Sequence, residues 1–280
     1  MIDFVRAVPQ YTFLQYALVA GVLVSVACGI VGTYVVTRRI SYIAGSISHC
    51  VLGGMGAARY FATVHHWEWL TPLQGAVVAA LAAALLIGFV SLRAKQREDT
   101  VIGALWAIGM AVGVLFISRT PGYNEDLMGY LFGNILMIAP NDLILIAGLD
   151  AVVILVGIAW HDQLLAVCFD EEFARLRGLE VEFFYLLLLC LTALTVVLLV
   201  SVVGIVLVIA LLTLPAAVAG HFAKTLRQMM VLATVCSVVF TTLGLALSYG
   251  PNLPAGATVI VLAGATYLVV AGGKALSRSR

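Results

Sequence analysis

The apolar residues of this chain lie in long runs separated by short polar segments. A helix that crosses a bilayer needs about 20 mostly apolar residues. The run from Phe183 to Ala219 is too long for one span, and Ser201 and Gly204 offer a turn within it. The pattern predicts an all-α polytopic membrane protein with about nine transmembrane helices. They are expected at residues 15–37, 43–62, 72–92, 100–118, 141–160, 183–200, 203–220, 229–248 and 255–273.

Segment 126–139 is a shorter apolar stretch. It carries Gly129 and Gly133 and stops at Pro140. Non-helical or broken segments at membrane depth occur where protein or a water-filled cavity surrounds them. This segment is therefore expected to be a half-length or re-entrant helix.

A charged segment, Phe169–Glu182, separates two apolar runs and reads FDEEFARLRGLEVE. Asp170 is a suitable N-cap, and Gly178 is a suitable end for a helix. The composition predicts a short amphipathic helix at the aqueous surface, where a soluble partner can dock.

Composition supports an integral membrane protein, since 63% of the residues are hydrophobic and only 10% are charged. Soluble domains carry about 25% charged residues. The five cysteines show no CxxC spacing and are expected to be small buried side chains. The N-terminus lacks the features of a signal peptide. Residues 1–280 are expected to form one transmembrane domain.

The basic residues suggest the orientation, because cytoplasmic loops carry an excess of Lys and Arg. If segment 126–139 does not cross, most basic residues fall on one side, and only Arg6, Arg59 and Arg119 lie elsewhere. The N-terminus is then outside, and the C-terminus and the charged segment are cytoplasmic. The clustered basic residues are Arg38, Arg39, Arg93, Lys95, Arg97, Arg175, Arg177, Lys224, Arg227, Lys274, Arg278 and Arg280.

His49 is a candidate metal ligand. It lies about 15 Å into its helix, counted from Arg39 at 1.5 Å per residue. Ionisable groups at that depth usually face a cavity or pathway, and imidazole is a common ligand of transition metals. The alternative is a packed, hydrogen-bonded histidine. Gly45 and Gly53 lie one turn before and after it.

Glu125 and Asp126 precede segment 126–139 on the outer side. Carboxylates at a pore mouth attract cations, so both are candidate metal residues; a solvated loop is the alternative. Asp142 is expected to cap its helix. Asp150 lies midway along a span and needs a partner or water.

The other histidines favour simpler interpretations. In the outer loop His65-His66-Trp67-Glu68-Trp69, the tryptophans are typical interfacial anchors, and metal capture by the histidines is the alternative. His161 and His221 lie at the ends of spans, where a solvated histidine is expected.

Three motifs of hydrolytic enzymes are absent from the sequence. There is no G-x-x-x-x-G-K-[ST] phosphate loop, no HExxH and no GxSxG. The chain is therefore not expected to be an enzyme. If ATP drives its activity, another chain must hydrolyse it.

Three motifs resemble the permease subunits of bacterial zinc, manganese and iron ABC importers. RRISYIAGSISHCVLGG begins at Arg38, EDLMGYLFGNIL at Glu125 and FDEEFARLRGL at Phe169; LLTLPAAVA at Leu211 also matches. Their order and spacing agree over nearly the whole chain. Two departures are Gly45, where the family often has Asp, and Leu52-Gly53-Gly54, where it often has Leu-Pro-Gly.

The resemblance implies a fold like that of the vitamin B12-importer class of permeases. It implies a homodimer in the bacterial plasma membrane, two cytoplasmic ATPase subunits and an extracytoplasmic metal-binding protein, with Zn²⁺, Mn²⁺ or Fe²⁺ as transported substrate and no stably bound cofactor. No nucleic acid is expected as a partner. The charged segment would be the coupling helix that docks on the ATPase, through Phe169, Asp170, Glu171, Glu172, Ala174, Arg175 and Gly178.

Three other functions are compatible with parts of the sequence. A proton-coupled carrier would need an inverted repeat, and none is visible. A membrane scaffold would tolerate substitution of His49, Asp126 and Asp150. A permease for a metal chelate such as a siderophore shares the charged segment but needs a wider pathway.

Overall fold

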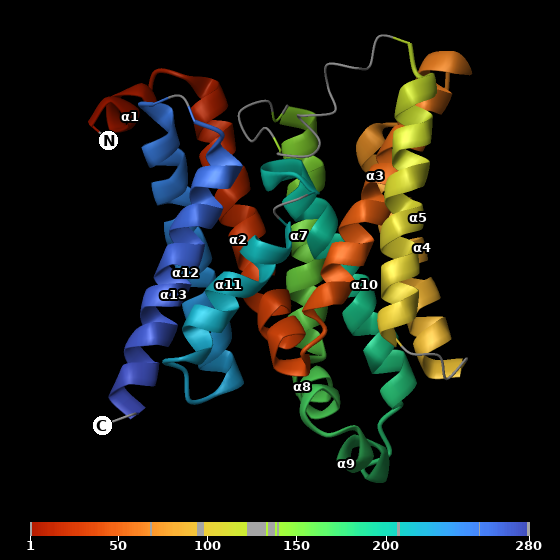
Figure 1. Cartoon of the computed structure of the whole chain (residues 1–280), viewed down its shortest axis with the longest axis vertical. Helices are drawn as coiled ribbons and strands as arrows, with labels where there is room; N and C mark the ends of the chain where they lie inside the picture. The colour runs from red at the N-terminus through yellow and green to blue at the C-terminus, as the bar shows by residue number, and fades with distance from the viewer. Residues whose placement is uncertain are drawn as a thin grey trace.

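A computed structural model describes residues 2–67, 69–93, 98–121, 133, 138, 140–205, 208–251 and 253–278. The regular elements among these residues are helical, and the long helices run side by side between an upper and a lower end (Figure 1). The N-terminus lies at the upper end and the C-terminus at the lower end (Figure 1). The helices are α1 (Ile2–Ala7), α2 (Thr12–Arg38), α3 (Ser41–Val64), α4 (Pro72–Arg93), α5 (Glu98–Arg119), α7 (Pro140–Ala159), α8 (His161–Phe169), α9 (Glu171–Leu176), α10 (Val181–Val203), α11 (Val208–Gly220), α12 (Leu226–Tyr249) and α13 (Ala255–Arg278).

The predicted all-α membrane class is confirmed, and each of the nine predicted ranges holds a helix. The count of nine full spans is wrong. By length and apolarity, six described helices qualify, or seven if α7 and α8 count as one bent span. Helix α11 has only 13 residues, about 20 Å at 1.5 Å per residue, against an apolar bilayer core of about 30 Å. Helix α3 has 24 residues, but its polar side chains lower its hydropathy.

The chain between α5 and α7 starts and finishes at the same end of the molecule. Helix α5 rises to Arg119 at the upper end, and α7 descends from Pro140 at that end (Figure 1). Apart from Gly133 and Ile138, the half-length helix expected at 126–139 lies outside the described residues. Helix α5 therefore ends, and α7 begins, on the same side of the molecule. The predicted charge asymmetry requires this arrangement.

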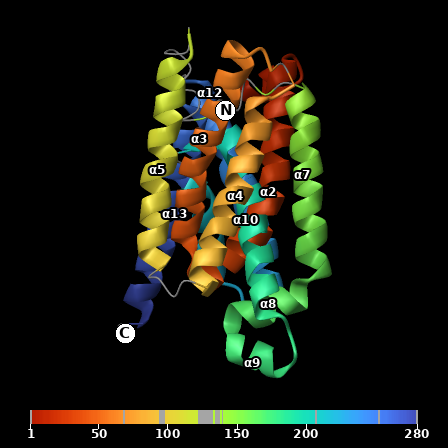
Figure 2. The same cartoon turned by 90° about the vertical axis from the view of Figure 1, so that its right-hand side faces the viewer.

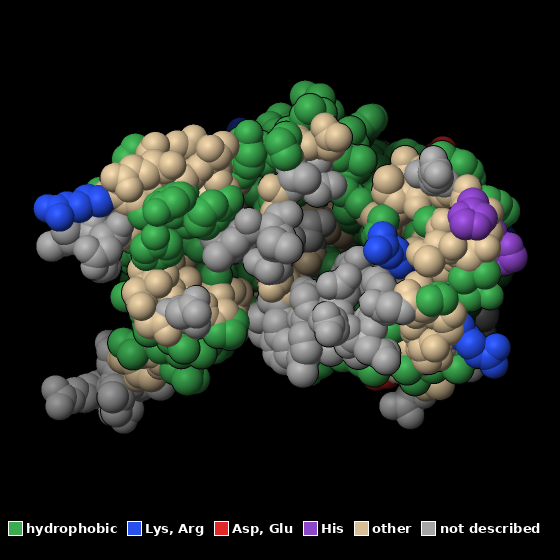
Figure 3. Space-filling model, turned by 90° about the horizontal axis from the view of Figure 1, so that it is seen from above, with side chains coloured by type: hydrophobic (Ala, Val, Ile, Leu, Met, Phe, Trp, Pro, Cys, Tyr) green, Lys and Arg blue, Asp and Glu red, His purple; other side chains and the backbone are tan. Residues whose placement is uncertain are grey.

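Basic residues gather at the lower end. The described helix ends and loops there carry Arg38, Arg39, Arg93, Arg175, Arg177, Lys224, Arg227 and Lys274, whereas Arg6, Arg59 and Arg119 belong to the upper end. The upper face shows only scattered basic side chains among apolar ones (Figure 3). Among the described residues, the predicted asymmetry holds.

Helices α2 and α10 form the centre of the bundle and bury most of their length, while α5 and α13 expose most of theirs. In the view of Figure 2, α5 and α7 flank α4, α10 and α2. Small residues let the helices approach closely, as in many membrane interfaces. A Cβ atom on Gly54 of α3 would lie 2.3 Å from the carbonyl oxygen of Gly75 in α4, and one on Gly75 would lie 2.4 Å from that of Gly54.

At the lower end the chain bends by 73° between α7 and α8. Helix α8 and the short α9 therefore lie below the bundle and lead into α10 (Figures 1 and 2). The short helix predicted within the charged segment 169–182 is α9, and it covers only Glu171–Leu176. Phe169 ends α8, and Val181 begins α10.

Candidate functional site

His49 lies on α3, and its side chain is only 7% exposed. Its ring stacks on that of Trp106 in α5, with ring centroids 4.8 Å apart and planes 25° from parallel. Its Nδ1 atom has no hydrogen-bond partner among the described residues. A buried imidazole nitrogen without a hydrogen-bond partner can coordinate a metal ion that enters the bundle, or take a proton from an entering ligand.

Helix α3, which carries His49, is held close to α5. Ser46 Oγ donates to the Ile102 carbonyl oxygen at 3.0 Å, and Cys50 Sγ contacts that of Leu105 at 3.5 Å. A Cβ atom on Gly109 of α5 would lie 2.8 Å from the Cα atom of Cys50. His49 is therefore carried by a tightly packed pair of helices, α3 and α5.

The space one turn before His49 is filled. A Cβ atom on Gly45 would lie 2.5 Å from Ile209 Cδ1 and 2.6 Å from Trp106 Cζ3. Glycine at this position therefore admits the indole and the isoleucine, and Gly45 supplies no second ligand beside His49.

Glu125 and Asp126, the predicted carboxylates of the pore mouth, lie outside the described residues, as does the side chain of Asp142, the predicted helix cap. Among the described residues, no group of three His, Cys, Asp or Glu side chains is arranged to hold a metal ion.

Asp150 is buried in α7, with only 2% of it exposed. Its Oδ1 atom has no hydrogen-bond partner among the described residues. It faces α2, where the backbone of Ala27 is a polar contact. Sequence reasoning expected a partner or water for this carboxylate, and the structure places it at the α2–α7 interface.

The outer aromatic loop packs on the end of α3. Trp67 stacks on Phe61 with centroids 5.1 Å apart and on Trp69 with centroids 6.1 Å apart, while the His65 ring contacts Tyr60 and Phe61. Trp69 stays 69% exposed. This arrangement at the upper end fits the predicted interfacial anchor.

Helix α9 is shaped by its two ends. The Asp170 carboxylate accepts a hydrogen bond from the Phe173 backbone N–H at 3.0 Å, which confirms the predicted N-cap. Gly178 follows the helix with φ of +79°, a conformation that glycine adopts at little cost. Glu171 and Glu172 in the first turn also interact favourably with the helix dipole.

Three large apolar side chains are exposed on α8 and α9 at the lower end of the molecule. Phe169, Phe173 and Leu176 are 68%, 51% and 86% exposed, whereas Ala174 is fully buried on the side that faces the bundle. Arg177 lies with its guanidinium carbon 5.2 Å from the centre of the Phe173 ring. Three exposed large apolar side chains beside charged ones are typical of a surface that a protein partner covers.

Arg38, at the end of α2, joins α8, α9 and α10. Its Nη1 atom donates to the Val167 carbonyl oxygen at 2.6 Å, and its Nη2 atom donates to the Glu171 carboxylate. Its guanidinium carbon lies 4.7 Å from the centre of the Tyr185 ring. We call these contacts the Arg38 clasp. They attach α9 to the central helix of the bundle.

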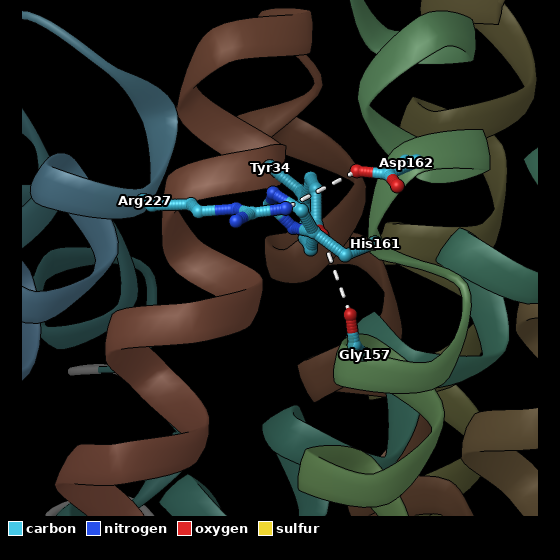
Figure 4. A network of polar contacts seen from close by, with 5 residues as sticks. All are labelled: Tyr34, Gly157, His161, Asp162 and Arg227. Carbon is cyan, nitrogen blue, oxygen red and sulfur yellow. Dashed lines mark hydrogen bonds and ion pairs between the residues drawn. The ribbon is translucent and has the colours of Figure 1, made fainter.

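One turn earlier on α2, Tyr34 holds the other end of α8. Its hydroxyl lies 2.7 Å from His161 Nδ1 and donates to the Gly157 carbonyl oxygen at 3.4 Å, across the bend between α7 and α8 (Figure 4). Beside them, Arg227 of α12 contacts Asp162 at 3.4 Å (Figure 4). Burial, and then Arg227, lower the pKa of His161, although Asp162 opposes them.

Sequence reasoning missed these lower-end contacts. His161 was expected to be solvated, but it is half-buried and hydrogen-bonded to Tyr34. Arg38 was identified only as one of the clustered charges and as the first residue of a family motif. Tyr34 and Arg38 are four residues apart and thus lie on one helix face, which is the one signal that connects them.

Comparison with known proteins gives a consistent result. The model of the ABC 3 transport family matches residues 10–273. An uncharacterized membrane protein of Synechocystis is 43% identical over 263 residues, which are 94% of this chain and 91% of that protein. The manganese transport system membrane protein MntC of Listeria monocytogenes is 33% identical over 260 residues, covering 93% of this chain and 90% of that protein.

Solved structures agree with the sequence matches. PsaBC from Streptococcus pneumoniae in complex with Fab superposes with a TM-score of 0.85 at 31% identity, covering 96% of this chain and 95% of that one. An inward-facing putative metal-chelate type ABC transporter gives a TM-score of 0.71 at 14% identity, covering 96% and 88%. The second match supports the fold alone.

Proposed function

The chain belongs to the ABC 3 transport family, and from this membership we propose that it is the permease subunit of an ATP-driven importer of a divalent transition metal ion. It is not itself the ATPase, because its sequence has no phosphate loop. It works as a homodimer in the bacterial plasma membrane, surrounded by lipid.

The observation that carries the proposal is the buried imidazole of His49. It lies well inside α3, with one ring nitrogen free of partners among the described residues. Polar groups inside a membrane are expensive and are typical of ion pathways. The metal ion passes His49 on its way through the bundle, and Glu125 and Asp126 attract it on the outer side. Binding along such a path must be weak enough for the ion to leave.

The lower end is the coupling surface. Phe169, Phe173 and Leu176 enter a groove of a cytoplasmic ATPase subunit, and two such subunits serve the dimer. Asp170 and Gly178 fix the ends of α9, and the Arg38 clasp passes its movement to α2. An extracytoplasmic metal-binding protein delivers the ion to the upper end, so that the N-terminus is outside and the C-terminus is cytoplasmic.

The relatives suggest which metal to test first. The Listeria relative is named as a manganese transport protein, so manganese is the first substrate to test, followed by zinc and iron. All three accept ligands of the His and carboxylate types.

Metal uptake by the reconstituted complex tests the proposal. His49→Ala should abolish ATP-driven uptake while the ATPase still co-purifies with the permease. Ser48→Ala is the matched control, since the Ser48 hydroxyl is used locally on the Gly45 carbonyl oxygen at 2.8 Å, and it should leave uptake unchanged. Unaltered uptake by the His49 variant would remove this residue from the pathway.

A further inference from the structure

The surroundings of His49 show a feature that the proposed function leaves unexplained. One face of the imidazole is covered by Trp106, and the same indole reaches the space beside Gly45. Trp106 is half-buried on α5, and Ser46 and Cys50 bond to the carbonyl oxygens of Ile102 and Leu105 in the turn that precedes it. The indole is therefore held between a metal-binding candidate and a position that carries no side chain.

Glycine at position 45 is required by this packing. A Cβ atom there would lie 2.6 Å from Trp106 Cζ3, 2.8 Å from Trp106 Cη2 and 2.5 Å from Ile209 Cδ1. These separations are shorter than real Cβ contacts, so one neighbour must move. Ile209 can turn its flexible end away, whereas the rigid indole is stacked on His49. Gly45 lies within α3 and has no positive φ, so the indole and not the backbone excludes a side chain.

Position 45 is where α3 would supply a second ligand. Residues four apart on a helix lie on one face, with Cβ atoms about 5–6 Å apart. A side chain at position 45 would therefore stand beside the imidazole. Building on the proposed function, we propose that Gly45 and Trp106 together determine the specificity of the His49 site, because glycine supplies no second α3 ligand and the indole fills the place that such a ligand would occupy.

The presence or absence of a second ligand at position 45 affects which metal ion is preferred. Imidazole suits zinc and iron, while carboxylate oxygens suit manganese. With Gly45 and Trp106 in place, α3 offers the passing ion an imidazole alone. This part of the pathway therefore favours zinc or iron over manganese and binds either ion weakly.

A set of substitutions tests both steps. Gly45→Ala adds only the Cβ atom, and Trp106→Leu removes the ring that meets it. The double variant Gly45→Ala/Trp106→Leu is the matched control for Gly45→Asp/Trp106→Leu, since both open the same volume and only the second adds a carboxylate. Each purified full-length permease, in complex with its ATPase, is titrated with Mn²⁺ and with Zn²⁺, and its thermal midpoint is recorded.

Gly45→Ala should lower the thermal midpoint, and adding Trp106→Leu should restore part of that loss. The ratio of Mn²⁺ affinity to Zn²⁺ affinity should be on the order of tenfold higher in Gly45→Asp/Trp106→Leu than in its control. A change of this size is typical when a partner of a metal site is altered. A Gly45→Ala variant as stable as the wild type would overturn the packing argument. Equal Mn²⁺ to Zn²⁺ ratios in the two double variants would overturn the assignment of specificity to the Gly45–Trp106 pair. Failure of the proposed function would appear separately, as absence of ATP-driven uptake by the wild type.

Discussion

Replacing Glu171 by Gln removes the charge that Arg38 contacts in α9 and leaves the length of the side chain unchanged. Arg38 is 16% exposed and Glu171 is 43% exposed in their side chains. An exposed ion pair contributes about 0.2–1 kcal/mol, and a hydrogen bond to a charged group about 1.5–3 kcal/mol. Because water reaches Glu171, we take about 1 kcal/mol for the loss, which is roughly a fivefold change in an equilibrium constant.

Arg38→Met removes more, since it also ends the bond to the Val167 carbonyl oxygen and the contact with the Tyr185 ring. A charge-assisted bond and a cation–π contact bring the loss to about 3 kcal/mol, or roughly a hundredfold at 1.4 kcal/mol per factor of ten. Both substitutions act on the same attachment of α9 to α2.

Hydrogen exchange measures this attachment. The relevant amides are those of Ala174, Arg177 and Leu179, which bond to carbonyl groups of residues 170, 173 and 174. Their exchange should rise about fivefold in Glu171→Gln and about a hundredfold in Arg38→Met, in proportion to local opening. Glu172→Gln is the matched control, because Glu172 is the exposed neighbour with no ion pair among the described residues. Equal exchange in the two Gln variants would refute the Arg38 clasp.

Two further predictions concern packing and pH. Gly54→Ala places a Cβ atom 2.3 Å from the Gly75 carbonyl oxygen, whereas a Cβ atom at Gly103 would have nothing within 4 Å. Thermal unfolding in detergent should therefore show a loss of about 1–3 kcal/mol of stability for Gly54→Ala and a far smaller loss for Gly103→Ala. Equal losses would contradict the close approach of α3 and α4. Because the pKa of His161 is lowered, the folded protein binds a proton at His161 less readily than the unfolded chain does. The stability that depends on neutral His161 is therefore complete above the ordinary histidine pKa of 6.5 and falls as the pH drops below 6.5. Melting curves between pH 7.5 and pH 5, on the order of the histidine range, should show a smaller decline in His161→Gln than in the wild type, and parallel declines would contradict this.

The positions of the helices could be predicted from the sequence because an apolar run of about 20 residues matches the thickness of a bilayer and is rare in soluble proteins. The turn at Gly204 was also predicted, and its φ of +81° at the end of α10 confirms it. The length of α11 could not be predicted, because the residues that follow Gly204 are as apolar as their neighbours. Hydropathy contains no signal that separates a turn inside the membrane from a continued helix.

The candidate site shows the same division. Asp170 and Gly178 act locally, so their roles at the ends of α9 follow from residue type and spacing. The partners of Arg38 and His161 come from helices more than 100 positions away in the sequence, and no local pattern shows them. Trp106 looks like an ordinary core aromatic in the sequence, because only the packing of α3 on α5 brings it over His49.

The central claim is that this chain imports a metal ion using ATP hydrolysed by a partner. The most direct measurement is uptake of radiolabelled Mn²⁺ and Zn²⁺ into vesicles that contain the permease with its ATPase, energised either by ATP or by a proton gradient. The account predicts uptake that requires ATP and the ATPase and disappears in His49→Ala. Uptake driven by the proton gradient without the ATPase would contradict it and identify a secondary carrier.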